Sequence, residues 1–142
     1  MEKLPGPDQS RLESCCASLG VVAFYAHGSY AQGRANTESD RDFAFLLNHG
    51  GNVERAMDAL IPLLAELFDV KEGLIDLQDL RMAPPAFRLK VIETGSLLYC
   101  GDTYQLARFH ACSVSEERDR QYFLRPFREA MRQRIREGRF AS

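Results

Sequence analysis

Two aspartates, Asp40 and Asp42, are separated by one residue at the start of an apolar segment. If that segment is a strand, its two-residue alternation puts both carboxylates on one face, with their Cα atoms roughly 7 Å apart. Adjacent carboxylates raise each other's pKa, so the pair is costly inside a fold unless a cation lies between them. Magnesium prefers hard oxygen ligands and completes its shell with waters and substrate phosphates. The pair therefore indicates a magnesium site that acts on a phosphate compound.

A possible phosphate loop precedes this pair. Ten residues separate Ser29 from Asp40, and Gly28 and Ser29 directly follow an apolar run. Glycine lets the backbone approach a phosphate closely, and a serine hydroxyl can donate a hydrogen bond to it. The spacing predicts that phosphate and metal meet between this loop and the carboxylates.

A third acid, Asp76, lies in the otherwise apolar sequence LIDL. Such a residue is rarely buried without a partner, which could be a metal ion or Arg41. We favour Asp76 as the acid of the site, but Asp79 would face inward instead if the register of the strand differed by one residue.

Alternating strands and helices are needed to position these acids. The continuous apolar run at 21–26 has glycine on both sides, which is typical of a central strand buried on both faces. Further strands are predicted at 42–47, 74–80 and 97–99, with a loop, or a loop with one helical turn, at 28–39. This alternation predicts an α+β or α/β fold, a small mixed sheet flanked by helices.

The predicted helices follow from apolar spacing and end signals. Asp8 is expected to cap a first helix of about ten residues that ends at Gly20. Later helices are expected from 53 to 68, from 84 to 93, and from about 103 to 137 after Asp102. Pro62 is expected to kink its helix or delay its start, and Pro126 to break the last one.

Composition limits the class of protein. The chain has 142 residues, 45% hydrophobic and 27% charged, with a net charge of -2, which suits one domain and gives no bias towards nucleic acid or membrane. No apolar run approaches the roughly 20 residues that span a bilayer, and the first ten residues do not resemble a signal peptide. We expect one cytoplasmic domain over 1–142, with reduced cysteines and no direct nucleic-acid binding.

Positive charge gathers at the end of the chain. From Glu116 onwards there are eight arginines and five acids, a net charge of +3, so the preceding part carries -5. The helical segment over about 103–138 is therefore either a solvated helix with internal ion pairs or a surface that docks a partner.

The motifs described above resemble a known family. Gly28-Ser29, then ten residues, then Asp40-x-Asp42, with Asp76 as third acid, is similar to the signature of nucleotidyltransferases of the polymerase beta superfamily. GSYAQG at 28–33, SDRD at 39–42, IDL at 75–77 and GSLLY at 95–99 resemble its minimal nucleotidyltransferase (MNT) subfamily.

The resemblance implies a polymerase beta-type fold with a long C-terminal helix and a two-metal site. It implies that Asp40, Asp42 and Asp76 are catalytic and bind two Mg2+ ions, and that Gly28 and Ser29 hold the phosphates of the substrate ATP. Asp76 would either activate the attacking hydroxyl or ligate the second ion. Gln32 departs from the arginine of many relatives, and Arg34 could replace its phosphate contact.

The resemblance also implies a partner. Many MNT proteins are antitoxins that transfer AMP from ATP to a tyrosine of a HEPN ribonuclease toxin. The alternatives are a nucleotidyltransferase for small molecules of the aminoglycoside type, and an inactive antitoxin that acts by binding alone. Small-molecule members usually carry an added acceptor domain, so this chain favours a protein acceptor. We assign no catalytic role to His27, expected only to orient the loop, and expect Arg88 and Lys90 to be solvated surface.

Overall fold

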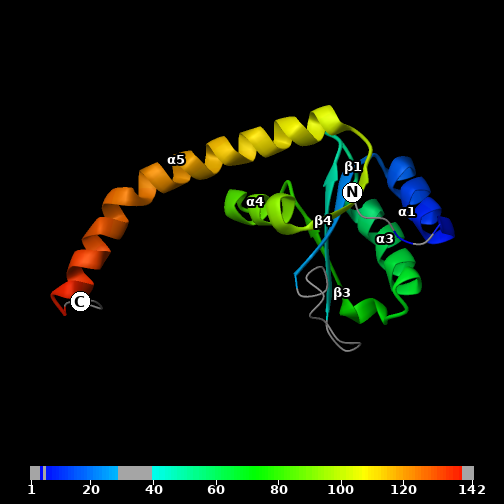
Figure 1. The fold of residues 1–142 in the computed structure, drawn as a ribbon, viewed down its shortest axis with the longest axis horizontal. Helices are drawn as coiled ribbons and strands as arrows, with labels where there is room; N and C mark the ends of the chain where they lie inside the picture. Colours follow the sequence, from blue (N-terminus) through cyan, green and yellow to red (C-terminus); the bar gives the residue numbers. More distant parts are fainter. Residues whose placement is uncertain (1–3, 5, 29–39, 139–142) are drawn as a thin grey trace.

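One four-stranded sheet forms the centre of the molecule (Figure 1). The computed structural model describes residues 4, 6–28 and 40–138. The strands are β1 (Val21–His27), β2 (Arg41–Leu47), β3 (Ile75–Asp79) and β4 (Ser96–Cys100), in the order β3-β2-β1-β4. β1 pairs antiparallel with β2 and β4, whereas β2 and β3 are parallel. The sheet is therefore mixed, which confirms the predicted α+β fold and the central position of the first strand.

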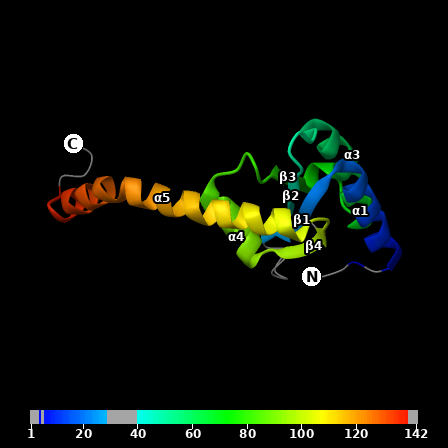
Figure 2. The same ribbon diagram turned by 90° about the horizontal axis from the view of Figure 1, so that it is seen from above.

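Helices cover both faces of the sheet (Figures 1 and 2). α1 (Gly6–Leu19) and α3 (Val53–Leu67) pack on one face, and α4 (Pro85–Thr94) and the start of α5 (Thr103–Arg136) pack on the other. A short 3-10 helix, Glu72–Leu74, leads into β3. Among the described residues, no helix is long and apolar enough to cross a membrane.

The alternation along β2 divides the core into two layers. Phe43 and Phe45 belong to the cluster that packs against α1 and α3, whereas Ala44 and Leu46 belong to the cluster under α4 and α5. The ring of Phe43 lies 5.6 Å from that of Phe24, and both are fully buried. Burying a phenylalanine contributes about 1.5–3 kcal/mol, so this layer holds β1 and β2 firmly in register.

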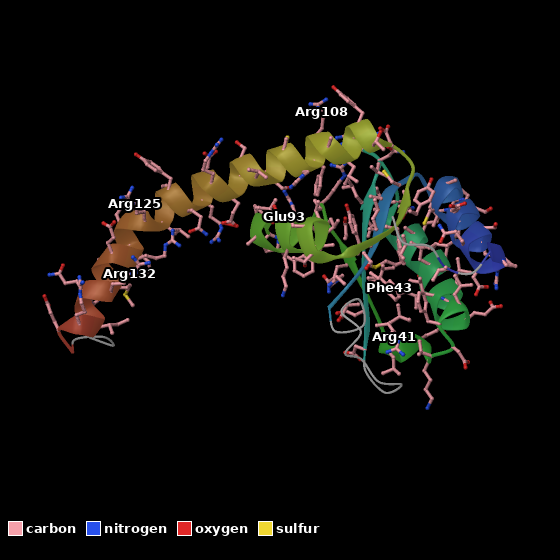
Figure 3. All side chains as sticks on the ribbon, viewed as in Figure 1. Arg41, Phe43, Glu93, Arg108, Arg125 and Arg132 are labelled. Carbon is pink, nitrogen blue, oxygen red and sulfur yellow. The ribbon has the colours of Figure 1, made fainter. Side chains whose placement is uncertain are left out.

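The expected helix ends and breaks were only partly right. The first helix begins at Gly6, so Asp8 lies in its first turn, where it suits the positive end of the helix dipole, and not at the cap. α3 starts directly after its cap Asn52, so Pro62 does not delay the start of that helix. α5 begins after Asp102, as predicted, and continues as one helix through the exposed Pro126, although its axis changes direction near Arg125 (Figure 3).

α5 is far longer than the sheet that it crosses. Its 34 residues span about 51 Å, and its distal half projects away from the domain (Figures 1 and 2). Ser113, in the half of α5 that packs on the domain, is buried. The predicted segment at 103–138 is therefore one helix, half packed on the domain and half extended from it.

Candidate functional site

The register of the sheet places His27, Asp42 and Asp76 in one row across three strands. Asp42 on β2 pairs with His27 on β1 and with Asp76 on β3. Residues that pair across strands point to the same face. Because Phe43 faces α1 and α3, its neighbour Asp42 faces the opposite side, towards α4. The row therefore lies on the α4 face, at the end of β1 and the beginning of β2.

Asp40 lies beside this row. It is exposed and directly precedes β2, two residues from Asp42. Its charge is one of the causes that raise the pKa of Asp42. The structure thus brings Asp40, Asp42 and Asp76 to one corner of the sheet.

The choice between Asp76 and Asp79 is decided by the strand register. Asp79 pairs with Phe45, at the far end of β3, and its Oδ1 accepts a hydrogen bond of 3.1 Å from the backbone nitrogen of Arg81. It therefore caps the turn after the strand. Asp76 accepts a hydrogen bond of 3.0 Å from Gln78 Nε2, whereas Arg41 is buried and pairs with Ile75 on the other face. Arg41 is not the partner of Asp76.

Neighbouring carboxylates affect the pKa of Asp42. Burial raises the pKa of Asp42 above its ordinary value; His27 opposes the shift, while Asp76 and Asp40 add to it. A divalent cation at this place would remove the repulsion. As the side chains stand, no group of three His, Cys, Asp or Glu residues in the described part of the chain could hold a metal ion. The donor chemistry of Asp42 and Asp76 nevertheless fits Mg2+, which is commonly held by one or two carboxylates together with substrate phosphates.

Gly28 directly follows β1 and lies against the side chain of Asp42. Its φ is +74°, a left-handed conformation that favours glycine. A Cβ atom added there would overlap Oδ2 of Asp42 and lie 3.2 Å from its Cγ. The glycine therefore leaves the carboxylate room to turn towards a ligand. Ser29, Gln32 and Arg34 lie outside the described residues.

His27 is a site residue that the sequence analysis did not assign. Burial lowers its pKa below the ordinary value for histidine, and the nearby Asp42 opposes the shift. Its Nε2 is buried without a hydrogen-bond partner among the described residues, and its ring meets that of Phe87 edge-on at 5.5 Å. Its position directly before Gly28, at the end of a buried strand, was the available signal.

The two basic residues of α4 differ in role. Arg88 forms an ion pair of 2.8 Å with Glu116, and donates to the carbonyls of Leu80 and Arg81. It is therefore a structural link between α4 and α5, and the expectation of a solvated side chain was wrong. Lys90 lies close enough to His27 for its charge to lower the pKa of that residue.

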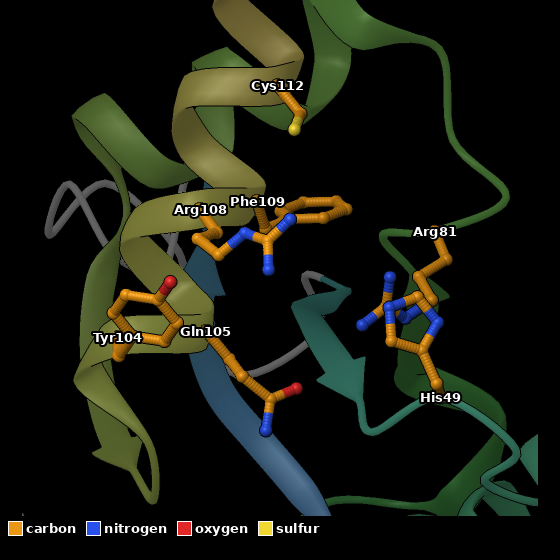
Figure 4. A pocket seen from close by; sticks show the side chains of 7 residues that line it. All are labelled: His49, Arg81, Tyr104, Gln105, Arg108, Phe109 and Cys112. Carbon is orange, nitrogen blue, oxygen red and sulfur yellow. The ribbon is translucent and has the colours of Figure 1, made fainter.

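A separate hollow of about 320 Å³ lies at the other end of β2 (Figure 4). Gln105 on its wall donates to Asn48 Oδ1 at 2.8 Å. The guanidinium of Arg81 lies 5.6 Å from the centre of the Phe109 ring, also on the wall. The hollow has no carboxylate lining and lies far along β2 from Asp42, so it is distinct from the acidic row. Its lining residues are His49, Arg81, Tyr104, Gln105, Arg108, Phe109 and Cys112.

Three solved structures have the same fold. A chain from a toxin–antitoxin complex with AMP-PNP has a TM-score of 0.66 and 23% identity, covering 86% of this chain and 96% of its own. A chain from the complex of a tri-AMPylated Shewanella oneidensis HEPN toxin with an MNT antitoxin has a TM-score of 0.60 and 21% identity, covering 87% and 95%. Another chain from Shewanella oneidensis has a TM-score of 0.59 and 21% identity, covering 89% and 98%.

The match to a protein family covers most of the domain. No curated protein matches the chain. The family described as "Polymerase beta, Nucleotidyltransferase" matches residues 11–104, from the first helix through the whole sheet to the start of α5. The matched segment contains every acid of the row. With its mixed sheet and long last helix, as in the MNT structures, the chain belongs to the polymerase beta nucleotidyltransferase family.

Proposed function

We propose that this chain is a Mg2+-dependent adenylyltransferase that transfers AMP from ATP to a tyrosine of a HEPN ribonuclease toxin. It would thereby act as the antitoxin of that toxin in the cytoplasm. The observation that carries the proposal is the row of Asp42 and Asp76 beside Gly28, within a domain of the nucleotidyltransferase family. The toxin–antitoxin complexes among the structural neighbours support a protein acceptor.

Asp40 and Asp42 would hold Mg2+, Asp76 would serve as the base, and Gly28 and Ser29 would hold the ATP phosphates. When bound, the metal neutralises negative charge on the α-phosphate and on the leaving pyrophosphate. Gly28 contributes by keeping the space above Asp42 free of a side chain, so that the triphosphate can approach. The exposed Asp40 directly precedes β2, two residues from Asp42, and would reach the same ligand from there.

The acceptor must lose a proton during transfer. A tyrosine hydroxyl has a pKa of about 10 and is therefore mostly protonated at neutral pH. The tyrosine oxygen forms a bond with the α-phosphorus of ATP while the bond to pyrophosphate breaks. Asp76, exposed at the edge of the row, accepts the proton. His27 is half-buried and pairs with Asp42 across β1 and β2, where it would help to position that carboxylate.

The AMP attached to the toxin would account for the loss of its ribonuclease activity. Each transferred AMP adds a bulky group and a negative phosphate to the toxin. Near a ribonuclease site, these obstruct RNA by steric overlap and by repulsion of its phosphates. The toxin therefore stays inhibited after the antitoxin departs.

The test looks in the neighbouring reading frame for a HEPN protein and incubates it with this chain, α-labelled ATP and Mg2+. Wild-type protein is expected to transfer label to the toxin, and Asp42→Asn to reduce transfer by at least ~100-fold, as expected when a metal-binding charge is lost. Asp79→Asn is the matched control, because this acid lies on β3 but caps a turn. Calorimetry with Ser29→Ala, and with chelator, tests whether ATP binding needs the loop and the metal. Wild-type transfer by Asp42→Asn, or equal ATP binding in excess chelator, would contradict the assignment.

A further inference from the structure

The distal half of α5, residues 118–136, leaves the domain and is called the arm here (Figures 1 to 3). The ion pair between Arg88 and Glu116, at 2.8 Å, ties α5 to α4 just before the arm begins. Within the arm, Arg125 pairs with Glu129, and Arg128 donates to the carbonyl of Gln121. These contacts are internal to α5, so they do not fasten the arm to the domain.

An isolated helix of this length is marginal in water, because most helix stability in proteins comes from the packing of an apolar face. Pro126 near the middle of the arm disfavours the helix further by removing a backbone donor. The arm receives little packing from the described residues. A bound partner would supply it.

The arm carries an apolar stripe. Phe123, Leu124, Phe127, Met131 and Ile135 recur at helical spacing on one side. Phe123 and Phe127 are 83% and 64% exposed. Large aromatic side chains at this exposure are characteristic of protein-binding surfaces.

The stripe continues the face by which α5 packs on the domain. Phe109, packed against the core under α4, and the buried Ser113 precede Leu124 and Phe127 at helical intervals along this face. A protein that covers the stripe therefore lies on the domain side of α5, next to α4. On α4, Phe87 meets His27 of the acidic row at 5.5 Å, so α4 lies between the arm and the site.

The positive charge of the arm favours a partner with an acidic surface. It contains seven arginines against Asp119 and Glu129, a net charge of +5, whereas residues 1–117 carry 10 basic and 17 acidic side chains, a net charge of -7. Two arms would repel each other, which disfavours pairing between copies through this helix. An acidic partner would be repelled by the domain and attracted by the arm.

We propose that the arm and the adjoining surface of α4 dock the AMP acceptor, a protein with an apolar groove flanked by carboxylates. The proposal rests on the proposed function and adds the surface that presents the tyrosine to Asp42 and Asp76. The arm supplies an apolar anchor and positive charge, and α4 sets the distance from that anchor to the acidic row.

The test compares Phe123→Ser/Phe127→Ser with Tyr122→Ser in the full chain. Tyr122 is 77% exposed but lies on the other side of the helix, so it is a matched control. The double variant is expected to bind the acceptor, the HEPN toxin of the proposed function, at least ~30-fold more weakly, as for an aromatic hot spot. The KM for that protein should rise, while kcat and ATP binding stay unchanged. Arg132→Glu, which keeps the apolar stripe, should weaken binding at low salt, because the positive charge of the arm attracts the carboxylates of the partner.

Several results would overturn the proposal. The first is unchanged toxin affinity in the double variant, or an equal loss of toxin affinity in Tyr122→Ser. The second is a wild-type dimer that the double variant dissociates. The third is binding to vesicles of anionic lipid, or to single-stranded RNA, that depends on the stripe while toxin affinity does not. Circular dichroism checks that the helix content is retained, and Arg132→Glu repeats the test if it is not. Tight toxin binding without AMP transfer, by both wild type and Asp42→Asn, would refute the proposed function but leave the docking surface standing.

Discussion

Substituting alanine for Gly28 tests whether the space above Asp42 matters for transfer. Two costs arise at this position. The left-handed φ of +74° costs alanine about 1–2 kcal/mol, and the new Cβ overlaps Oδ2 of Asp42. The flexible carboxylate must therefore turn away by roughly 1 Å, and a misplacement of this size at a catalytic site can cost about 10²-fold in rate.

Gly50→Ala separates the two costs. Gly50 has a φ of +78° and nothing within 4 Å of its added Cβ, so it carries the backbone strain without the overlap. Both variants should melt about 3–8 °C below wild type, given about 1–2 kcal/mol of strain. AMP transfer should fall about 100-fold in Gly28→Ala and stay near wild type in Gly50→Ala.

Thermal melting and label transfer to the toxin, measured on the same preparations, give both quantities. Equal transfer by the two glycine variants would refute the reasoning that Gly28 reserves space for a ligand of Asp42. A much larger loss of stability in Gly28→Ala than in Gly50→Ala would show that the overlap destabilises the fold and does not displace the carboxylate of Asp42.

Three further predictions concern charge and burial. Without Mg2+, Asp42→Asn should melt above wild type at neutral pH, because it removes a carboxylate whose pKa is raised by burial and by repulsion from Asp76 and Asp40. Asp102→Ala should lower the melting temperature by about 2–4 °C through loss of the α5 cap. Because hydrogen bonds from Gln105 lower the pKa of Asp102, this difference should be present above the ordinary aspartate pKa and vanish as pH falls through the lowered value. In thiol labelling followed by peptide mapping, Cys112 should react rapidly and Cys16 should not, because Cys16 is fully buried and burial raises its pKa.

The strand pattern could be predicted because the apolar runs are long and bounded by glycine and turn residues. The run at 21–26 corresponds to β1, whose first six residues are buried. The start of the first helix could not be placed, because Asp8 suits either a cap or a first turn and nothing in the sequence separates the two. The path through Pro126 was missed because it depends on exposure of that turn.

Only part of the candidate site could be predicted from the sequence. The motif identified Asp42, but the choice between Asp76 and Asp79 depends on the parallel register of β2 and β3, which pairs residues far apart in sequence. His27 was missed for the same reason, since its place beside Asp42 follows from the antiparallel register of β1 and β2. Its lowered pKa arises mainly from burial, which only the fold reveals.

By the proposed function, the acidic row transfers AMP to a protein, so one molecule of this chain neutralises many toxin molecules. The direct measurement is the intact mass of the toxin after incubation with ATP, Mg2+ and a substoichiometric amount of this chain. We expect the whole toxin population to gain one or more AMP masses and to lose ribonuclease activity, while the same amount of Asp42→Asn changes neither. An unchanged toxin mass, with inhibition only when the two proteins are present in equal amounts, would indicate neutralisation by binding alone and refute AMP transfer.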